Sequence, residues 1–285
     1  MAVSSSATKV FKQAPLPFIG QKRNFIKSFC EVLNDNIHGL GEEWTIVDAF
    51  GGSGLLSHHA KRLKPHARMI YNDFDNYAQR LKHIDDTNRL RRQLAEVLKG
   101  IPLENKIDKK THATHALIIE TIKNFDGFID IDCVGAWLLF SGNQAENLNQ
   151  IYTEPVLYNR LRKSDYPDAK DYLTGVEVVS KSFDELLSEY VNNEKTLFIL
   201  DPPYLFSQQK GYHKSKAFGL VSFLKLIKLI RPPFIIFSNE YSQLLEYFDN
   251  EIRHNNKRFL NYKYISITAP LNKYGTYRDN MIYKF

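Results

Sequence analysis

Short apolar runs alternate with helical patterns near the start of the chain. The apolar residues of 25–33 recur at helical spacing, and the β-branched run 44–48 that follows predicts a strand. A glycine-rich turn at 51–54 then leads into a helical pattern at 55–63 and a second predicted strand at 68–71. This succession of elements is typical of the opening βαβ unit of a parallel sheet.

The same rhythm returns after residue 175. Predicted strands at 176–179, 197–200 and 234–237 are separated by predicted helices at 184–190 and about 217–230. These strand runs are nearly all apolar, as expected for strands that are buried on both faces of a sheet. The chain therefore returns to the sheet that its first part began.

Residues 77–175 lack this rhythm, because they are rich in charge and in helix-forming residues and show no strand–glycine–helix signal. We expect them to form an inserted, mainly helical lobe. Near the end of the chain, 264–268 and 281–283 predict two antiparallel strands that close one edge of the sheet. The predicted fold class is α/β, with 15–76 and 176–285 forming one domain around the insertion.

Composition narrows the possible classes of protein. Apolar residues make up 43% of the chain, but no run of about 18 apolar residues occurs, which excludes a membrane-spanning helix. Residues 1–14 are polar and Ser-rich without the apolar core of a secretory signal, so we expect a flexible leader. Two cysteines, Cys30 and Cys133, cannot build a disulfide framework, which favours a reducing, cytoplasmic location. The net charge of +6 favours a polyanionic partner without requiring one.

The tetrapeptide Asp201-Pro202-Pro203-Tyr204 directly follows a predicted strand. Ligands of open α/β sheets bind beyond the carboxyl ends of the strands, so this segment lies where a site is expected. Two consecutive prolines make a stiff segment that presents carbonyl acceptors beside a carboxylate and an aromatic ring. This combination suits an exocyclic amine, which has two N–H donors. The alternative is an ordinary loop whose tyrosine packs on the core.

The turn at 48–54, Asp-Ala-Phe-Gly-Gly-Ser-Gly, ends the first predicted strand. Glycines there allow a ligand to approach the backbone, and the following helix start offers free N–H groups. The turn is not a P-loop, because no Gly-Lys-Ser/Thr sequence follows it. It also departs from the dinucleotide fingerprint, which has Gly or Ala where this chain has Ser57. Asp73 follows the second strand, 19 residues after Gly54, where a carboxylate conventionally binds ribose hydroxyls. Both segments could equally be tight structural turns.

Four segments, taken in order, resemble the DNA adenine-N6 methyltransferases, in particular the group of the bacterial and phage Dam enzymes. That group has Phe/Trp-x-Gly-x-Lys, Asp-x-Phe-x-Gly-x-Gly, Asn-Asp and Asp-Pro-Pro-Tyr segments. The corresponding residues here are 18–22, 48–54, 72–73 and 201–204. The run 234–239 is also similar to the strand after the family's catalytic loop. The resemblance covers 17–76 and 176–285 but not the middle of the chain.

The resemblance implies a Rossmann-like class I methyltransferase sheet, S-adenosylmethionine as cofactor, and 77–175 as a target-recognition lobe. The implied cofactor-binding residues are Phe18, Gly20, Lys22, Asp48, Phe50, Gly52, Gly54, Asp73 and Ser182. Ser182 departs from the family, which often has an aspartate there, and it accepts hydrogen bonds more weakly. The Asn-Arg and Asn-Gly signature of Dam members is missing near 137–143, so residues that read GATC cannot be transferred.

The implied reaction is a direct methyl transfer to N6 of adenine, without a metal. The Asp201 carboxylate and the Pro202 carbonyl would accept the two N–H donors of the amine. An aspartate with a pKa of about 3.9 is too acidic to deprotonate a neutral amine, so proton loss should accompany or follow the transfer. The adenine must be flipped out of its duplex, and stacking on Tyr204 would offset part of that cost.

The loop after the tetrapeptide is basic, and we expect Lys210, Tyr212 and Lys214 to contact nucleic acid unless the loop is merely solvated. The pairs His58-His59 and His112, His115 lack matching Cys or carboxylate ligands, so no metal is expected.

The sequence thus predicts a site-specific adenine methyltransferase that acts on double-stranded DNA, of a phage, a prophage or a solitary bacterial system. No membrane and no obligate protein partner are indicated. An RNA adenine-N6 methyltransferase and a catalytically silent DNA-binding module remain alternatives. Methylation of a cytosine amino group is less compatible with Asp201, because that family usually carries Ser at this position.

Overall fold

The computed structural model describes residues 9–141, 143–204, 218–239, 243–272 and 275–285. The chain divides into two compact units. The first consists of Met1–Gln13, Gly20–Tyr77 and Asp171–Phe285, and the second of Ala14–Ile19 and Ala78–Lys170. The first unit contains a seven-stranded sheet, and the second is mainly helical with a two-stranded sheet.

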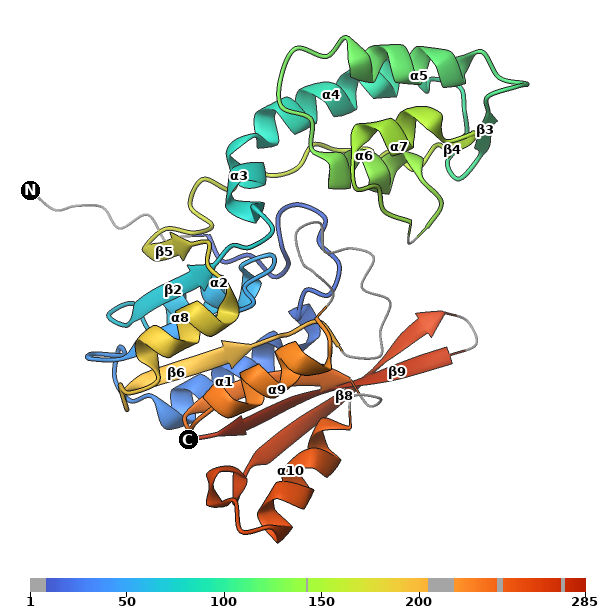
Figure 1. Ribbon diagram of the computed structural model, residues 1–285. Helices are drawn as coiled ribbons and strands as arrows, with labels where there is room; N and C mark the ends of the chain where they lie inside the picture. Colours follow the sequence, from blue (N-terminus) through green and yellow to red (C-terminus); the bar gives the residue numbers. More distant parts are fainter. Residues whose placement is uncertain (1–8, 142, 205–217, 240–242, 273–274) are drawn as a thin grey trace, which may run out of the picture. The chain divides into compact units, whose positions relative to one another are not determined.

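The large sheet of the first unit is mostly parallel, with the strand order β5-β2-β1-β6-β7-β9-β8 (Figure 1). The first five strands in this order pair in parallel, whereas β9 runs antiparallel to β7 and β8 antiparallel to β9. The strands are β1 Thr45–Asp48, β2 Arg68–Asn72, β5 Val176–Val179, β6 Thr196–Leu200, β7 Phe234–Asn239, β8 Lys263–Asn272 and β9 Gly275–Lys284.

Helices pack on both faces of this sheet. Along β6, Leu197 and Ile199 join one hydrophobic core, while Phe198 and Leu200 join the other. This alternation explains why the strand is apolar at every position, since both of its faces are covered. The first core packs against α1 and α2 and the second against α8, α9 and α10. Their bounds are α1 Ile26–Asn36, α2 Leu55–Leu63, α8 Phe183–Tyr190, α9 Leu220–Leu229 and α10 Leu244–Arg253, with 3-10 turns at Arg23–Phe25 and Lys257–Phe259.

This topology confirms the predicted Rossmann-like α/β fold. The two antiparallel strands predicted near the C-terminus are also present, although β8 and β9 extend well beyond 264–268 and 281–283. Within the described residues, no helix has the length and apolar character that crossing a membrane would require.

Helices make up most of the regular secondary structure of the second unit. These are α3 Tyr77–Lys82, which begins at the last residue of the first unit, α4 Ile84–Val97, α5 Thr114–Lys123, α6 Ile131–Leu138 and α7 Leu148–Thr153. The antiparallel pair β3 Lys106–Asp108 and β4 Val156–Tyr158 was not predicted, because three residues are too few to show a period of two. A role in target recognition stays a prediction for this unit.

Residues 15–19 were assigned by sequence to the α/β domain, but the structure groups 14–19 with the second unit. The guanidinium of Arg80 donates a hydrogen bond to the carbonyl of Pro17 at 2.9 Å, and Ala14 and Leu16 are buried. Hydrogen bonding and burial in this unit, rather than chain proximity to α1, therefore decide where the segment belongs.

Candidate active site

Three carboxylates follow or end neighbouring strands at the same edge of the large sheet. Asp48 ends β1 and pairs in register with Ile199 of β6 and Tyr71 of β2. Asp201 directly follows β6, and Asp73 directly follows β2. The parallel register therefore brings together three residues that are up to 153 positions apart in the sequence. This is the edge at which ligands of open α/β sheets bind.

An ion pair holds the carboxylate of Asp201. The ammonium of Lys22 lies 2.6 Å from Oδ2 of Asp201 and also donates a hydrogen bond to the carbonyl of Gly20 at 2.8 Å. The same ammonium lies 5.5 Å from the ring centre of Tyr204 and 5.7 Å from that of Phe237. Burial raises the pKa of Asp201, and the charge of Lys22 opposes this shift. Lys22 thus favours the ionised, hydrogen-bond-accepting form of the carboxylate.

Asp48 is a buried carboxylate with a single strong hydrogen bond. The hydroxyl of Ser57 donates to its Oδ2 at 2.7 Å. Burial raises the pKa of Asp48 to about 7, and the negative charge of Asp201 adds to this effect. Among the described residues, no side chain or backbone group forms a hydrogen bond with Oδ1 of Asp48. The site therefore has a buried acceptor oxygen that a ligand could satisfy.

Ser57 is a site residue whose role the sequence did not indicate. It was read only as a departure from the dinucleotide fingerprint, but its hydroxyl is the donor that holds Asp48. Its place on the first turn of α2 follows from the nine-residue spacing across the glycine turn. A serine at this spacing after a strand-end aspartate is the signal that could have found it.

The glycine turn between β1 and α2 requires its glycines. Gly52 and Gly54 have φ values of +50° and +67°, which side chains rarely adopt. A Cβ at Gly51 would lie 2.1 Å from the ring of Tyr71. The hydroxyl of that tyrosine lies 2.6 Å from the carbonyl of Gly52 and 3.1 Å from Oδ1 of Asp73. Tyr71, which the sequence analysis treated only as part of a strand, thus connects the turn with the carboxylate.

The Asn72-Asp73 pair has structural partners as well as a position at the site. The Asn72 amide donates to the carbonyls of Ala49 and Lys181 at 2.9 and 3.0 Å, and Lys181 N–H donates back to Asn72 at 2.9 Å. Asn72 therefore ties the ends of β1, β2 and β5 together. Oδ1 of Asp73 accepts a hydrogen bond from the backbone N–H of Tyr77 at 2.6 Å. Ribose binding by Asp73 stays a prediction.

Ser182 caps a helix. Its hydroxyl accepts from the N–H of Glu185 at 3.4 Å, and its own N–H donates to the carboxylate of Glu185 at 3.2 Å, which together form a capping box at the start of α8. A contact of Ser182 with a cofactor stays a prediction.

Phe50 of the glycine turn packs against two other aromatic rings. Its ring centre lies 5.3 Å from that of Phe183, in a stacked arrangement, and 5.8 Å from that of Phe218, which it meets edge-on.

Gly20 and Lys22 belong to the first unit, whereas Phe18 belongs to the second. Lys210, Tyr212 and Lys214 lie outside the described residues.

The histidine pairs have structural partners. A ring nitrogen of His58 forms a hydrogen bond with the carbonyl of Tyr172, and one of His59 with the carbonyl of Phe11. Burial lowers the pKa of His58 to about 4. In the second unit, His115 is bonded to the carbonyl of Glu154 at 2.9 Å. Across the described ranges, no group of three or more His, Cys, Asp or Glu side chains could hold a metal ion.

Comparison with known proteins is consistent with this geometry. The model of the D12 class N6 adenine-specific DNA methyltransferase family matches residues 18–220. A Haemophilus influenzae protein named "Putative methyltransferase" is 50% identical over 281 residues, which cover 97% of this chain and 94% of the relative. The family match includes the glycine turn, Asp73 and the Asp-Pro-Pro-Tyr segment.

Proposed function

Because the chain belongs to the family of D12 class N6 adenine-specific DNA methyltransferases, we propose that it methylates N6 of adenine in double-stranded DNA. S-adenosylmethionine is the proposed methyl donor. The observation that carries this proposal is the Asp201 carboxylate, held by Lys22 at 2.6 Å and placed at the same sheet edge as Asp48. The RNA and DNA-binding alternatives lack a specific structural observation in their favour.

The residues of the β1 end fit the proposed cofactor. When bound, S-adenosylmethionine supplies an electrophilic methyl group on a positively charged sulfonium. Asp48 and Asp201 repel each other, and the unsatisfied Oδ1 of Asp48 favours a ligand that carries hydrogen-bond donors or positive charge. The turn at 48–54 and the Asp73 carboxylate would hold this ligand, with Phe50 offering an aromatic surface.

Asp201 and Pro202 would act on the amine of the target base. The lone pair of adenine N6 is delocalised into the ring, so acceptors that bind its N–H groups make the nitrogen more nucleophilic. The carboxylate of Asp201 and the carbonyl of Pro202 are two such acceptors on a stiff segment. Lys22 favours the ionised carboxylate against the effect of burial, and this carboxylate would stabilise the positive charge that develops on nitrogen. The amine then loses one proton to Asp201 or to water.

The target adenine must leave the duplex to reach this segment, at a cost of a few kcal/mol. Stacking on the ring of Tyr204 would return about 1–3 kcal/mol. Lys210, Tyr212 and Lys214 are proposed to contact the nucleic acid, and the second unit is proposed to recognise the target sequence.

The test measures methyl transfer from labelled S-adenosylmethionine to duplex DNA and to RNA. The control substrates are a duplex DNA and an RNA in which other bases replace adenine. We expect incorporation into adenine N6 of DNA, and a loss of at least about a thousandfold in Asp201→Ala and Asp201→Asn. Asp35→Ala, at an exposed position of α1, is the matched control and should retain activity. Calorimetry should show that both Asp201 variants still bind the cofactor.

The proposal fails in either of two outcomes. One is incorporation into RNA alone or into cytosine, which would assign another substrate. The other is turnover of Asp201→Ala at the rate of the Asp35→Ala control, which would remove the proposed role of the carboxylate.

A further inference from the structure

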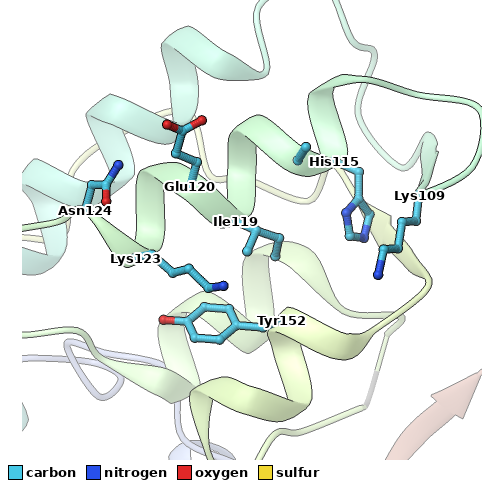
Figure 2. A pocket seen from close by; sticks show the side chains of 8 residues that line it. Lys109, His115, Ile119, Glu120, Lys123, Asn124 and Tyr152 are labelled. Carbon is cyan, nitrogen blue, oxygen red and sulfur yellow. The ribbon is translucent and has the colours of Figure 1, made fainter.

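A groove in the second unit lies between α5 and α7, with a volume of about 540 Å³. Figure 2 shows the side chains that form it. His115, Ile119 and Lys123 follow one another at intervals of four residues, so they form one stripe along α5. Tyr152 of α7 faces this stripe, and Lys109 lies near its beginning. The groove thus combines an aromatic and aliphatic centre with a lysine at either end.

The lysines around this groove differ from five arginines of the same unit. Carboxylates form ion pairs with the guanidinium groups of Arg80, Arg89, Arg91, Arg92 and Arg160. In the described part of the chain, by contrast, Lys106, Lys109, Lys110 and Lys123 form no ion pair. Among the described residues of this unit, unpaired lysines therefore gather near β3 and at the end of α5, around the groove, and others lie elsewhere at Lys82, Lys99 and Lys163.

The interior of the groove is suited to a ligand that is anionic and partly apolar. The ammonium of Lys123 lies 5.1 Å from the ring centre of Tyr152, so the ring holds the cation over the groove. Glu120 is the one carboxylate among the lining residues, and its side chain points away from Tyr152 (Figure 2). An anion between the two lysines would therefore meet no carboxylate directed at it from this lining.

The spacing of the lysines fits a nucleic-acid strand. His115, which lies beside Lys109, and Lys123 are eight residues apart on α5, a rise of about 12 Å. One DNA strand carries a phosphate for about every 3.4 Å of helix axis, so 12 Å corresponds to about three nucleotide steps. The aliphatic and aromatic side chains between the lysines would then face the sugars.

From these observations we infer that the α5–α7 groove binds the phosphodiester backbone of the duplex DNA substrate, through Lys109, Lys123 and Tyr152. This inference rests on the proposed function for the identity of the substrate, but it assigns a site outside the catalytic segment. Contacts of this kind contribute affinity and orientation without reading the sequence.

The test measures binding of a labelled adenine-containing duplex by fluorescence anisotropy at salt concentrations from about 50 to 200 mM. The double variant Lys109→Ala/Lys123→Ala should raise Kd about tenfold and reduce the slope of log Kd against log salt by about two. Tyr152→Ala should raise Kd several-fold without changing that slope, because it removes no charge. The matched control is Lys82→Ala/Lys99→Ala, which removes two exposed lysines of the same unit outside the groove.

Thermal unfolding of each variant in a Trp44→Phe background, followed through the fluorescence of Trp137, first establishes that the second unit is folded. If the wild type methylates DNA but the groove variant has the Kd and slope of the wild type or of the control, the groove inference alone is wrong. If the wild type binds no duplex, or only RNA, both the groove inference and the proposed substrate are wrong. A loss of slope specific to the groove variant supports the inference.

Discussion

The two units of this protein treat buried charge in opposite ways. In the second unit, the guanidinium of Arg80 contacts Asp130 at 2.9 Å and Asp132 at 2.8 Å, and Asp130 also accepts from the N–H of Cys133 at the start of α6. In the first unit, Asp48 has a serine hydroxyl as its donor, and no described residue forms an ion pair with it. The second unit therefore neutralises this buried charge internally, whereas the candidate site pairs Asp201 with Lys22 but leaves Asp48 without an ion pair among the described residues.

The pKa directions follow from this difference. Burial opposes the charge of Arg80, yet Asp130 and Asp132 together raise its pKa, so the cation is stabilised. For Asp48 burial is the dominant cause and raises the pKa, and the hydrogen bond from Ser57 opposes this shift only in part. A satisfied ion cluster stabilises a fold only when it is complete, and an unsatisfied carboxylate is typical of a place where a ligand binds. Variants of Arg80 test the paired cluster, and variants of Asp48 test the carboxylate of the candidate site.

The largest effect is expected from breaking the complete cluster. Arg80→Met removes the cation that pairs with the buried Asp130 and the partly exposed Asp132, and should lower the free energy of unfolding of the second unit by about 3–5 kcal/mol. The chain has two tryptophans, Trp44 in the first unit and Trp137 in the second, so in a Trp44→Phe background the fluorescence of Trp137 reports urea unfolding of the second unit.

The matched control for that measurement is an ion pair nearer the surface of the same unit. Arg160 pairs with Glu104 at 3.1 Å, and Glu104 is mostly exposed. Arg160→Met should cost less than about 1 kcal/mol. Equal losses in Arg80→Met and Arg160→Met would contradict the view that the buried cluster is the structural element.

A smaller effect of opposite sign is expected at Asp48. The pKa of Asp48 is about 7 in the folded protein, whereas the ordinary value of 3.8 applies to the unfolded chain. The folded state therefore holds the proton more tightly than the unfolded state. This group therefore costs stability as pH rises from about 4 to about 7. Asp48→Asn cannot ionise, and Ser57 can still donate to the amide oxygen. Without cofactor, the variant should have a larger free energy of unfolding than the wild type at pH 8. This difference should be smaller at pH 5, by on the order of 3 kcal/mol.

Urea unfolding at both pH values measures this margin, with Asp35→Asn as a control on exposed helix surface. A margin that is constant with pH, or larger at pH 5, would show that Asp48 is not held in a charge-disfavouring environment.

The smallest effect concerns the link between the glycine turn and Asp73. Tyr71→Phe removes the hydroxyl that reaches Gly52 and Asp73, and should raise KM for S-adenosylmethionine about fivefold with little change in kcat. Tyr172→Phe is the matched control, because its buried hydroxyl bonds the carbonyl of Ser53 in the same turn at 3.1 Å. A rise in KM of the same size in both variants would contradict a specific role of the Tyr71–Asp73 contact.

Local patterns in the sequence were sufficient to predict most of the sheet. The runs at 197–200 and 234–237 lie within β6 and β7, since an all-apolar run between helical patterns has few other stable structures in a soluble domain. The short strands of the second unit and the grouping of 14–19 were missed. Three-residue strands show no period, and the place of 14–19 depends on the distant Arg80.

The candidate site could be predicted in part for the same reason. Asp48, Asp73 and Asp201 are recognisable because each follows or ends a strand, and parallel strands share one carboxyl edge. The roles of Ser57 and Tyr71 were missed, since each depends on the direction in which one side chain points, although the spacing between Asp48 and Ser57 was visible in the sequence.

By itself, then, the amino-acid sequence determined which segments of the first unit form the strands of the large sheet. It also determined the α/β class and the strand ends at which chemistry is expected. These properties depend on neighbours within a few residues, where periodicity and turn residues act. Only the tertiary structure decided that Lys22 pairs with Asp201, 179 residues away. It also decided that, among the described residues, Asp48 forms no ion pair, and that Arg80 and Arg91 are ion-paired whereas Lys109 and Lys123 are not. Electrostatic interactions depend on distance in space and on burial, and neither is encoded in local sequence spacing.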